Sequence, residues 1–308
     1  MAAQAHSAAP SGCNPALSGA ALLRWRRELL RHGDQPASLD WLLDLEGGIG
    51  WQQLQQLRLQ PEAMVTLKAP LAHLEALWQR HCRHQEPLQY LVGQCPWRDI
   101  TLNVAPGVLI PRQETELLVD LALQCWERQG GPHAPRHWAD LGTGSGCLAL
   151  ALARAWPDSQ GSAVDQSPEA LLQAGANLQA HGCAERVRLL QGNWWQPLRP
   201  LWGCLELVVA NPPYIPQAVW RELDPVVREH EPALALVGGD DGLEALRAIA
   251  AGAQEALAPG GWLLVEHHHD QSEAVAALLR EAGLLQVEAH PDLEGKRRFA
   301  SAQAPQRP

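Results

Sequence analysis

The sequence has no long apolar run, no extended basic segment and few charged residues. Charged residues make up 19% of the 308 residues, the formal net charge is -10 and the pI is near 5.7, so the chain has no general attraction to phosphate backbones. The densest cationic stretches, residues 24–32 and 296–299, are short, and the first has the spacing of a solvated helix face. No uncharged apolar run reaches membrane-spanning length. These observations predict a soluble protein without direct nucleic-acid contact or membrane attachment.

Closely spaced cysteine pairs are also missing. The seven cysteines are odd in number and widely spaced, and none forms a C-x-x-C pair, which argues against a disulfide framework and a zinc site. Residues 1–18 lack the basic start and apolar core of a targeting peptide, so we expect a disordered leader there. We therefore expect a monomeric, cytoplasmic protein without a bound metal.

The length and the apolar periodicity predict two domains. Over residues 19–92, Leu and Trp recur at three- and four-residue intervals, which is typical of a small helical domain. Residues 93–110 change character: "DITLNV" (99–104) and "GVLI" (107–110) predict two short strands split by Ala-Pro-Gly, a hairpin that links the domains. Residues 111–308 form the second domain.

The second domain alternates short apolar strands with helical segments. Helices are expected at residues 145–155, 167–181 and 241–257. Strands are expected at residues 137–142, 161–165, 186–190, 205–210, 261–266, 284–290 and 297–302. This rhythm predicts an α/β fold with a doubly wound, seven-stranded, mixed Rossmann-like sheet. Because only "PDLEGK" separates the last two strands, they should pair antiparallel.

The segment "DLGTGSG", residues 140–146, lies between the first strand of this sheet and its helix. Gly142, Gly144 and Gly146 let the backbone approach a ligand closely and leave the helix N-terminus free to face a carboxylate or a phosphate. Gly144, Gly146 and Ala149 also satisfy the relaxed dinucleotide fingerprint. The segment alone therefore does not choose between nucleotide cofactors, and a tight glycine turn without a ligand is a further interpretation.

Two other strand ends carry candidate ligand-binding side chains. Asp165 ends the second strand, where a carboxylate can accept hydrogen bonds from both hydroxyls of a ribose, although helix capping would also explain it. After the third strand, Asn193 offers a polar partner and Trp194 a flat wall for an adenine, whereas an arbitrary Trp belongs to the core. Their place at the C-terminal edge of parallel strands favours binding.

The fourth strand ends in Asn211, Pro212, Pro213 and Tyr214, for which a simple proline turn is the plain alternative. The side-chain oxygen of Asn211 and the carbonyl of Pro212 can accept both hydrogens of an -NH2 group. Such a grip aligns a planar nitrogen with a methyl donor and stabilises the positive charge that develops on it. The prolines keep the carbonyl aimed, and Tyr214 can stack on a flat amide or base. Hydride transfer has no use for this arrangement, which favours methyl transfer.

These motifs together resemble a known family. "DLGTGSG" followed by "VVANPPYI" resembles the class I S-adenosylmethionine-dependent methyltransferases that act on exocyclic or amide nitrogens. Four more segments narrow the resemblance to the release factor glutamine methyltransferases, over residues 85–300: "PLQYLVG", "VLIPRQETELLVD", "REHEPALALVGGDDGLEALR" and "LAPGGWLLVEHHHDQ". The resemblance implies methyl transfer from S-adenosyl-L-methionine to N5 of the glutamine in the Gly-Gly-Gln motif of a class 1 peptide chain release factor. It also implies that the helical domain, residues 19–92, helps to dock that factor.

The resemblance further implies a role for each matching residue. The methionine part of the cofactor would be surrounded by Gly142, Thr143, Gly144, Ser145 and Gly146. The rest of the cofactor would contact Asp165 at its ribose, together with Asn193, Trp194 and Asn211. The substrate glutamine would be gripped by Asn211, Pro212, Pro213 and Tyr214, of which Asn211, Pro212 and Tyr214 would be catalytic.

One segment matches the family with a substitution. "PRQETE", residues 111–116, corresponds to the family's PRPxTE segment, with Gln113 at the usual proline position. Its polar cluster would order the cofactor or the substrate entrance, and a helix-capping network explains the cluster equally well. The cluster consists of Arg112, Glu114, Thr115 and Glu116.

A second segment departs from the family. After Glu266 the chain has His267, His268 and His269, where the family carries a glycine by the second position. Three adjacent histidines suggest a metal site. Consecutive strand residues point to opposite faces, however, so these side chains converge poorly on one ion. We expect the substitution to alter the local loop and not the reaction.

Two other functions remain open from the residues. A DNA or RNA adenine-N6 methyltransferase would use the same Asn-Pro-Pro-Tyr arrangement on an adenine amine, although the acidic balance weighs against it. A binding module that kept the cofactor fold without turnover is the second alternative, against which the intact Asn211 and the three glycines argue.

Overall fold

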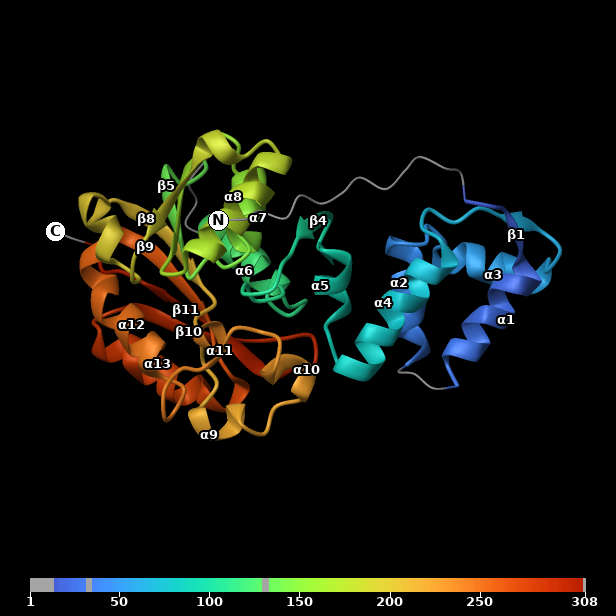
Figure 1. Cartoon of the computed structure of the whole chain (residues 1–308). Coiled ribbons are helices and arrows are strands. Elements are labelled where there is room, and N and C mark those ends of the chain that lie inside the picture. Colours follow the sequence, from blue (N-terminus) through green and yellow to red (C-terminus); the bar gives the residue numbers. More distant parts are fainter. Residues whose placement is uncertain (1–13, 32–34, 129–132, 307–308) are drawn as a thin grey trace, which may run out of the picture. The chain divides into compact units, whose positions relative to one another are not determined.

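The computed structural model describes residues 14–31, 35–128 and 133–306, and the chain divides into two compact units between Val92 and Gly93 (Figure 1). Of the leader expected at residues 1–18, residues 1–13 lie outside the described part. The remainder differs from the expectation, because Leu17–Ser18 form a short strand and Asn14 Nδ2 donates hydrogen bonds of 3.0 Å to the carbonyls of Leu67 and Lys68. These contacts fix the chain before the first helix.

The described part of the first unit is mainly helical. Its elements are β1 (Leu17–Ser18), α1 (Gly19–Leu29), α2 (Pro36–Leu45), α3 (Trp51–Leu59), β2 (Met64–Val65), α4 (Leu71–His84) and α5 (Leu88–Val92). Helix α1 begins after Ser18, whose hydroxyl accepts a hydrogen bond from the Ala21 amide at 3.2 Å. Strands β1 and β2 pair antiparallel, and leucines from the helices pack around Trp78 in a separate core.

The second unit starts with a hairpin whose position differs from the expected one. Strands β3 (Gln94–Trp97) and β4 (Ile100–Asn103) pair antiparallel around a turn at Arg98, whereas residues 107–110 form no strand. Pro96 is tolerated in β3 because this ladder has only two strands, so both are edges. The apolar side chains at 108–110 instead face the interior and a pocket, which explains their strand-like pattern.

The second unit is built on the expected seven-stranded mixed sheet. Its strands are β5 (His137–Leu141), β6 (Gln160–Asp165), β7 (Val187–Gln191), β8 (Leu205–Ala210), β9 (Leu257–Glu266), β10 (Leu285–Pro291) and β11 (Arg297–Gln303). The spatial order is β10-β11-β9-β8-β5-β6-β7, with β11 antiparallel to both β9 and β10 and the other pairs parallel. The prediction that the last two strands pair antiparallel is therefore confirmed.

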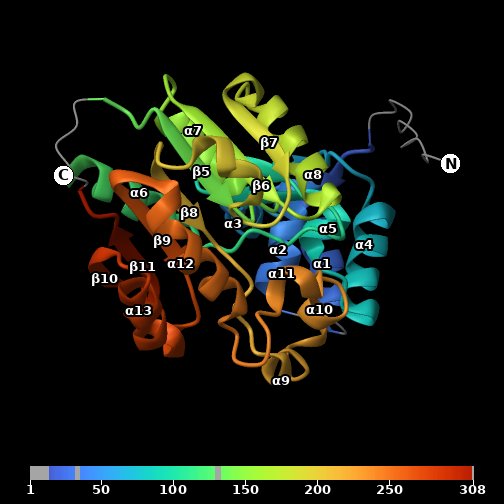
Figure 2. The same cartoon turned by 90° about the vertical axis from the view of Figure 1, so that its left-hand side faces the viewer.

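Helices cover both faces of this sheet (Figures 1 and 2). One face carries α6 (Glu116–Arg128), α7 (Cys147–Ala155) and α8 (Pro168–Ala180), and the other carries α12 (Glu244–Ala256) and α13 (Ser272–Glu281). The short helices are α9 (Gln217–Trp220), α10 (Pro225–Arg228), α11 (Ala233–Leu236), η1 (Ala184–Arg186), η2 (Gln196–Leu201) and η3 (His269–Gln271). None of the helices in the described ranges is long and apolar enough to cross a membrane.

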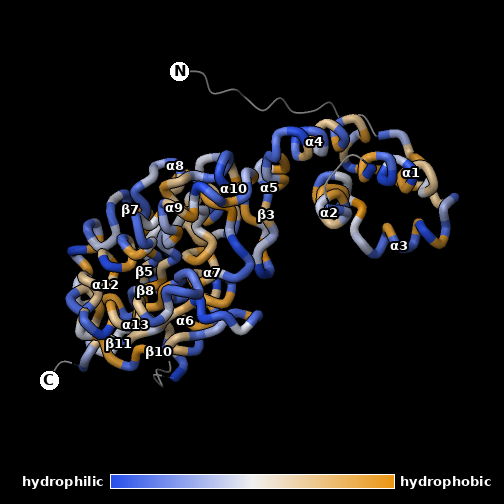
Figure 3. The backbone as a smooth tube through the Cα atoms, turned by 90° about the horizontal axis from the view of Figure 1, so that it is seen from below, coloured by the Kyte–Doolittle hydropathy of each residue, from blue (hydrophilic) through white to orange (hydrophobic). Residues whose placement is uncertain are grey.

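Alternation along the central strands explains why the sheet needs both layers. In β8, Leu207 and Val209 pack with α6 and α7, whereas Val208 and Ala210 pack with α12 and α13. A strand buried on both faces reads as a continuous apolar run, which is the pattern of β8 over residues 207–210. In Figure 3, orange hydrophobic and blue hydrophilic stretches alternate along the backbone of the second unit.

The strand order also determines where a ligand can enter. From β5 the chain proceeds to β6 and β7 on one side, and β8 then pairs with β5 on the other side. The loops after β5 and β8 therefore diverge to opposite faces of the sheet. Open parallel sheets bind ligands at the carboxyl end of such a switch point, which here lies between Leu141 and Ala210.

Candidate active site

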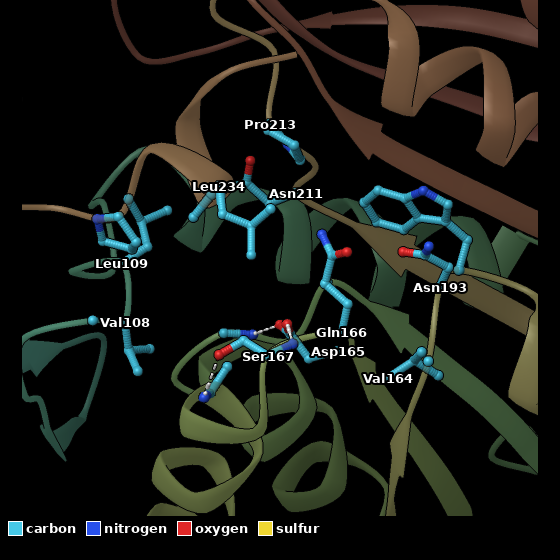
Figure 4. A pocket seen from close by; sticks show the side chains of 18 residues that line it. Val108, Leu109, Val164, Asp165, Gln166, Ser167, Asn193, Asn211, Pro213 and Leu234 are labelled. Carbon is cyan, nitrogen blue, oxygen red and sulfur yellow. Dashed lines mark hydrogen bonds between the residues drawn. The ribbon is translucent and has the colours of Figure 1, made fainter. Parts of the chain in front are cut away.

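A pocket opens at this switch point and collects residues from several strand ends (Figure 4). Its empty space is about 680 Å³, a volume that includes the solvent-filled mouth. The predicted residues that line it are Gly142, Gly144, Asp165, Asn193, Trp194, Asn211 and Pro213. A smaller adjoining hollow is also lined by Gly142, Gly144 and Asn211 and adds Thr143, Ser145 and Thr115. The structure thus brings most of the predicted cofactor residues together.

The glycine segment has two kinds of glycine. A Cβ on Gly144 would meet nothing within 4 Å, and its φ of +54° is in the left-handed region, so this residue presents bare backbone to the pocket. Gly146 does not line the pocket: a Cβ there would lie 2.9 Å from the Cβ of Ala174 in α8. Gly146 therefore allows close packing of α7 on α8, and Gly144 leaves room for a ligand.

Asp165 is half-buried at the end of β6 and lines the pocket. Its Oδ2 accepts a hydrogen bond of 2.9 Å from the Gly144 amide, and its Oδ1 accepts one of 2.9 Å from the Ser167 amide (Figure 4). Burial raises the pKa of this carboxyl, and the backbone hydrogen bonds oppose that rise. The carboxylate supports the glycine segment and the start of α8, and each oxygen retains a lone pair for a hydroxyl.

Trp194 forms a wall of the pocket. Its ring lies beside Gly142, where a Cβ would be 3.3 Å from the ring atom Cζ3. The Trp194 φ of +43° is unusual for a bulky residue and indicates that the surrounding structure holds this backbone in place. Asn193 is exposed at the pocket margin. An aromatic wall with a polar neighbour suits a purine ring, although Trp194 also packs on the core.

The Asn-Pro-Pro-Tyr segment splits into pocket-facing and supporting residues. Asn211 and Pro213 line the pocket, whereas Pro212 is buried and Tyr214 lines neither hollow. The Tyr214 hydroxyl donates a 3.2 Å hydrogen bond to Oε1 of Glu266, the last residue of β9. Asn211 Nδ2 donates a 3.0 Å hydrogen bond to Thr115 Oγ1. Figure 4 shows Asn211 and Pro213 on the side of the pocket opposite Asp165 and Ser167.

Two buried carboxyl groups support the site. Asp140 Oδ2 accepts hydrogen bonds from Thr143 Oγ1 at 2.7 Å and from the Ala149 amide at 3.1 Å, and burial raises its pKa to about 7. Glu266 Oε2 accepts a 2.7 Å hydrogen bond from Thr115 Oγ1, and burial raises its pKa to about 7 as well. The sequence places Asp140 in the glycine segment, but it gives no sign that Glu266 contacts Thr115, the residue to which Asn211 is hydrogen-bonded.

The "PRQETE" segment contributes one residue to this network. Thr115 does not cap α6 with its hydroxyl, because that group is hydrogen-bonded to Glu266 and Asn211. Arg112 Nη2 forms a 2.6 Å ion pair with the buried Glu231, and Glu116 Oε1 accepts a 2.8 Å hydrogen bond from the Arg98 amide. The helix-capping interpretation of Thr115 is therefore wrong. Gln113 and Glu114 are exposed.

The three histidines follow the end of β9, and the ring centroids of His268 and His269 lie 4.2 Å apart, so these two side chains do not point to opposite faces as expected. His267 is buried, and burial lowers its pKa. His268 Nδ1 lies 2.6 Å from Asp270 Oδ1, and His269 is exposed. Within residues 14–31, 35–128 and 133–306, no three His, Cys, Asp or Glu side chains are placed to hold a metal ion.

One wall of the pocket was not anticipated. It consists of Gly107, Val108 and Leu109 from the loop after the hairpin, and of Pro232, Leu234 and Ala235 around α11. Gln166 and Ser167 add polar groups beside Asp165 (Figure 4). The sequence signal for this wall is the family resemblance of two segments, "VLIPRQETELLVD" and "REHEPALALVGGDDGLEALR". Neither segment has a strand or helix period that would place it at the switch point.

Comparison with known proteins agrees with this geometry. Residues 115–223 match the family model of the methyltransferase small domain. The catalytic domain of hMettl16, solved in complex with the MAT2A 3'UTR hairpin 6, superposes with a TM-score of 0.52 at 13% identity, covering 67% of this chain and 76% of that one. At this identity the likeness concerns the fold alone, and it agrees with the predicted doubly wound, Rossmann-like sheet.

Curated relatives match over nearly the full chain. The release factor glutamine methyltransferase of Prochlorococcus marinus is 50% identical over 92% of this chain and 96% of its own length. The enzyme of the same name from Thermosynechococcus vestitus is 42% identical over 94% of this chain and 100% of its own length. Such identity over more than nine-tenths of both chains shows that the chain belongs to the release factor glutamine methyltransferase family.

Proposed function

We propose that this protein transfers a methyl group from S-adenosyl-L-methionine to the side-chain amide nitrogen of the glutamine in the Gly-Gly-Gln motif of class 1 peptide chain release factors. The observation that carries the proposal is the position of Asn211: it lies at the carboxyl end of β8, lines the pocket and is followed by Pro212 and Pro213. The names of the full-length relatives support the choice of substrate.

The pocket fits the proposed cofactor on three features of this chain. Gly144 leaves open backbone, Asp165 offers a half-buried carboxylate, and Trp194 offers a ring face on the same pocket. These groups suit an amino-acid moiety, a ribose and an adenine, respectively. The cofactor, when bound, supplies a sulfonium-linked methyl group that is open to attack by a nitrogen. Thr143 and Ser145 border the adjoining hollow and complete the glycine segment around it.

The residues after β8 would hold the accepting nitrogen. The oxygen of the Asn211 side chain and the carbonyl of Pro212 accept the two N–H groups of the glutamine amide and stabilise the charge that grows on its nitrogen. Pro213 fixes the backbone that aims the carbonyl. Tyr214 stabilises this turn through the hydrogen bond of its hydroxyl to Glu266. No strong base is required, because the proton can leave to water after the methyl group has been transferred.

The proposal extends to the partner and its docking. The first unit exposes large apolar side chains, of which Trp51 is 67% and Leu59 84% accessible, and both belong to α3. We take these two side chains as candidate contacts for a protein partner. We infer that this unit contacts the release factor, and that the protein works as a monomer in the cytoplasm, where release factors act.

The decisive experiment supplies purified protein and methyl-labelled S-adenosylmethionine with a class 1 release factor and its Gln→Ala variant. Label on the unaltered factor alone is the expected result, and label on both factors or on neither removes the proposal. Parallel reactions with DNA and RNA test adenine methylation. Asn211→Ala is the control, because it should abolish transfer and leave cofactor affinity within a few-fold. Cofactor binding without transfer to any partner would instead favour a non-catalytic binding module.

A further inference from the structure

A line of hydrogen-bonded side chains lies behind Asn211 and connects three segments that are distant in sequence. Asn211 Nδ2 donates to Thr115 Oγ1 at 3.0 Å, and Thr115 Oγ1 donates to Glu266 Oε2 at 2.7 Å. The other carboxylate oxygen, Oε1, accepts the Tyr214 hydroxyl at 3.2 Å. Thr115 precedes α6, Asn211 and Tyr214 follow β8, and Glu266 ends β9.

The chemistry of the threonine hydroxyl gives this line a direction. A hydroxyl carries one hydrogen, and above about pH 7, where Glu266 is ionised, the hydrogen of Thr115 is used on Glu266, since an ionised carboxylate can only accept. Thr115 Oγ1 can therefore only accept from Asn211, so the nitrogen end of the Asn211 amide must face it. The oxygen end then points away from Thr115. Because Asn211 lines the pocket, this oxygen is the acceptor that it offers there.

The burial of the two supporting residues makes this direction firm. Thr115 is 2% and Glu266 1% accessible, so water does not compete for their hydrogen bonds. Turning the Asn211 amide around would place its oxygen against the Thr115 oxygen and would leave one of these buried groups without a partner. The amide is thus held in one of its two orientations before any substrate arrives.

We propose that Thr115 and Glu266 are positioning residues, which hold the Asn211 side-chain oxygen toward the amide of the substrate glutamine. The inference rests on the proposed function, in which Asn211 accepts a hydrogen bond from that amide. Thr115 acts directly on Asn211, and Glu266 acts through Thr115. The same carboxylate anchors Tyr214, so one buried group supports both ends of the Asn-Pro-Pro-Tyr turn.

The first test compares Thr115→Val with Thr115→Ser in the full-length protein. Valine keeps the shape of threonine without the hydroxyl, and serine keeps the hydroxyl. Because a small displacement of a catalytic group is costly, Thr115→Val should lower kcat for release factor methylation about 10- to 100-fold. Its Kd for S-adenosylmethionine should stay within about twofold, and Thr115→Ser should retain kcat within about threefold. A kcat near wild type in Thr115→Val, or an equal loss in Thr115→Ser, overturns the proposal.

Two further variants control for folding and for Glu266. Ser159→Ala removes another buried hydroxyl, one that bonds Trp138 and the Trp156 carbonyl before β6, and it should leave kcat unchanged. Glu266→Gln retains an acceptor for Thr115 and should keep more than a third of kcat, whereas Glu266→Leu should match the loss in Thr115→Val. If Thr115→Val does not fold, this Glu266 pair decides in its place, and equal activity of the pair overturns the proposal.

A spectroscopic test separates this inference from the choice of substrate. In ¹⁵N-labelled protein without ligands, the side-chain amide signal of Asn211 is identified by its loss in Asn211→Ala. The amide hydrogen that faces Thr115 should exchange slowly with solvent in wild type and in Thr115→Ser, and at least about tenfold faster in Thr115→Val. Equal exchange in all three proteins overturns the positioning role. Should the wild-type protein methylate no release factor, the proposed function falls, and the exchange rates still decide whether Thr115 orients Asn211.

Discussion

We expect Gly144→Ala mainly to weaken cofactor binding and Gly146→Ala mainly to lower the stability of the fold. Both glycines have positive φ, +54° and +81°, so a side chain at either position adds backbone strain of about 1–2 kcal/mol. The space around them differs. A Cβ at Gly144 meets nothing within 4 Å, whereas a Cβ at Gly146 lies 2.9 Å from the Ala174 Cβ and 3.0 Å from the Ala174 Cα. Because the Cα belongs to the backbone of α8, rotation of a side chain cannot relieve this contact.

The expected magnitudes follow from these contacts. Overpacking of this kind costs about 1–3 kcal/mol. The free energy of unfolding should therefore fall by about 1–2 kcal/mol in Gly144→Ala and by about 2–5 kcal/mol in Gly146→Ala. With a urea slope of about 2 kcal/mol per molar, the midpoints should drop by about 0.5–1 M and about 1–2.5 M, respectively.

Urea unfolding followed by circular dichroism, with calorimetric titration of S-adenosylmethionine, measures both effects. Gly144→Ala fills space that the ligand would use, so it should weaken cofactor binding more than tenfold despite its small loss of stability. Gly146→Ala should lose stability and, at temperatures where it stays folded, bind the cofactor within a few-fold of wild type. The assignment of one glycine to the ligand and the other to helix packing is refuted if Gly144→Ala is the less stable variant, or if it binds normally.

Three other outcomes are expected. Asp165→Ala should raise the Kd for S-adenosylmethionine about 10- to 100-fold by calorimetry, as the loss of charge-assisted hydrogen bonds predicts, and an unchanged Kd contradicts the ribose assignment. Leu59→Ser should raise KM for the release factor about fivefold and leave kcat unchanged. The control is Leu293→Ser, at a residue that is 91% exposed in the second unit, and it should leave KM unchanged. Equal KM values in the two variants argue against docking by the first unit. Burial raises the pKa of Glu266 from 4.5 to about 7, so its stabilising contribution is complete below about pH 4.5 and is lost as the pH rises through about 7. The wild-type free energy of unfolding should therefore fall by up to about 3 kcal/mol over this pH range, and this fall should be absent in Glu266→Gln. Thermal unfolding of both proteins between about pH 4 and 8 measures the difference. If the two proteins have the same pH profile, Glu266 does not titrate near neutrality.

The sheet could be predicted from sequence because its signals are local. A run such as residues 205–210 is apolar except for Glu206, as expected of a strand that is buried on both faces, and turn residues bound it on either side. The hairpin was misplaced because Ala105, Pro106 and Gly107 suggest its turn, whereas the turn lies at Arg98 and the first strand contains Pro96, which a two-stranded ladder tolerates. The burial of Val108 and Ile110 arises from tertiary contacts that imitate a strand pattern.

Some contacts of the candidate site could be predicted from the sequence in the same way, and others could not. Gly142, Asp165 and Asn211 lie at or directly after strand ends that share one edge of the sheet, so their proximity follows from the topology. The contact between Thr115 and Glu266 joins residues that are 151 positions apart. No local pattern encodes that pairing, because it depends on the register between β8 and β9 and on the path of the loop before α6.

The contact of Thr115 with Glu266 has a consequence for how the enzyme becomes active during its synthesis. A nascent chain that has emerged only as far as residue 256 already contains the glycine segment, Asp165 and Asn211, but not β9 with its terminal carboxylate. Translation proceeds from the N-terminus, so the strand that completes the support of Asn211 is among the last to leave the ribosome. We therefore expect catalytic competence to arrive late, when nearly the whole polypeptide has been made. Products truncated before β9 should be less active than the complete chain, although they carry the motifs up to Tyr214.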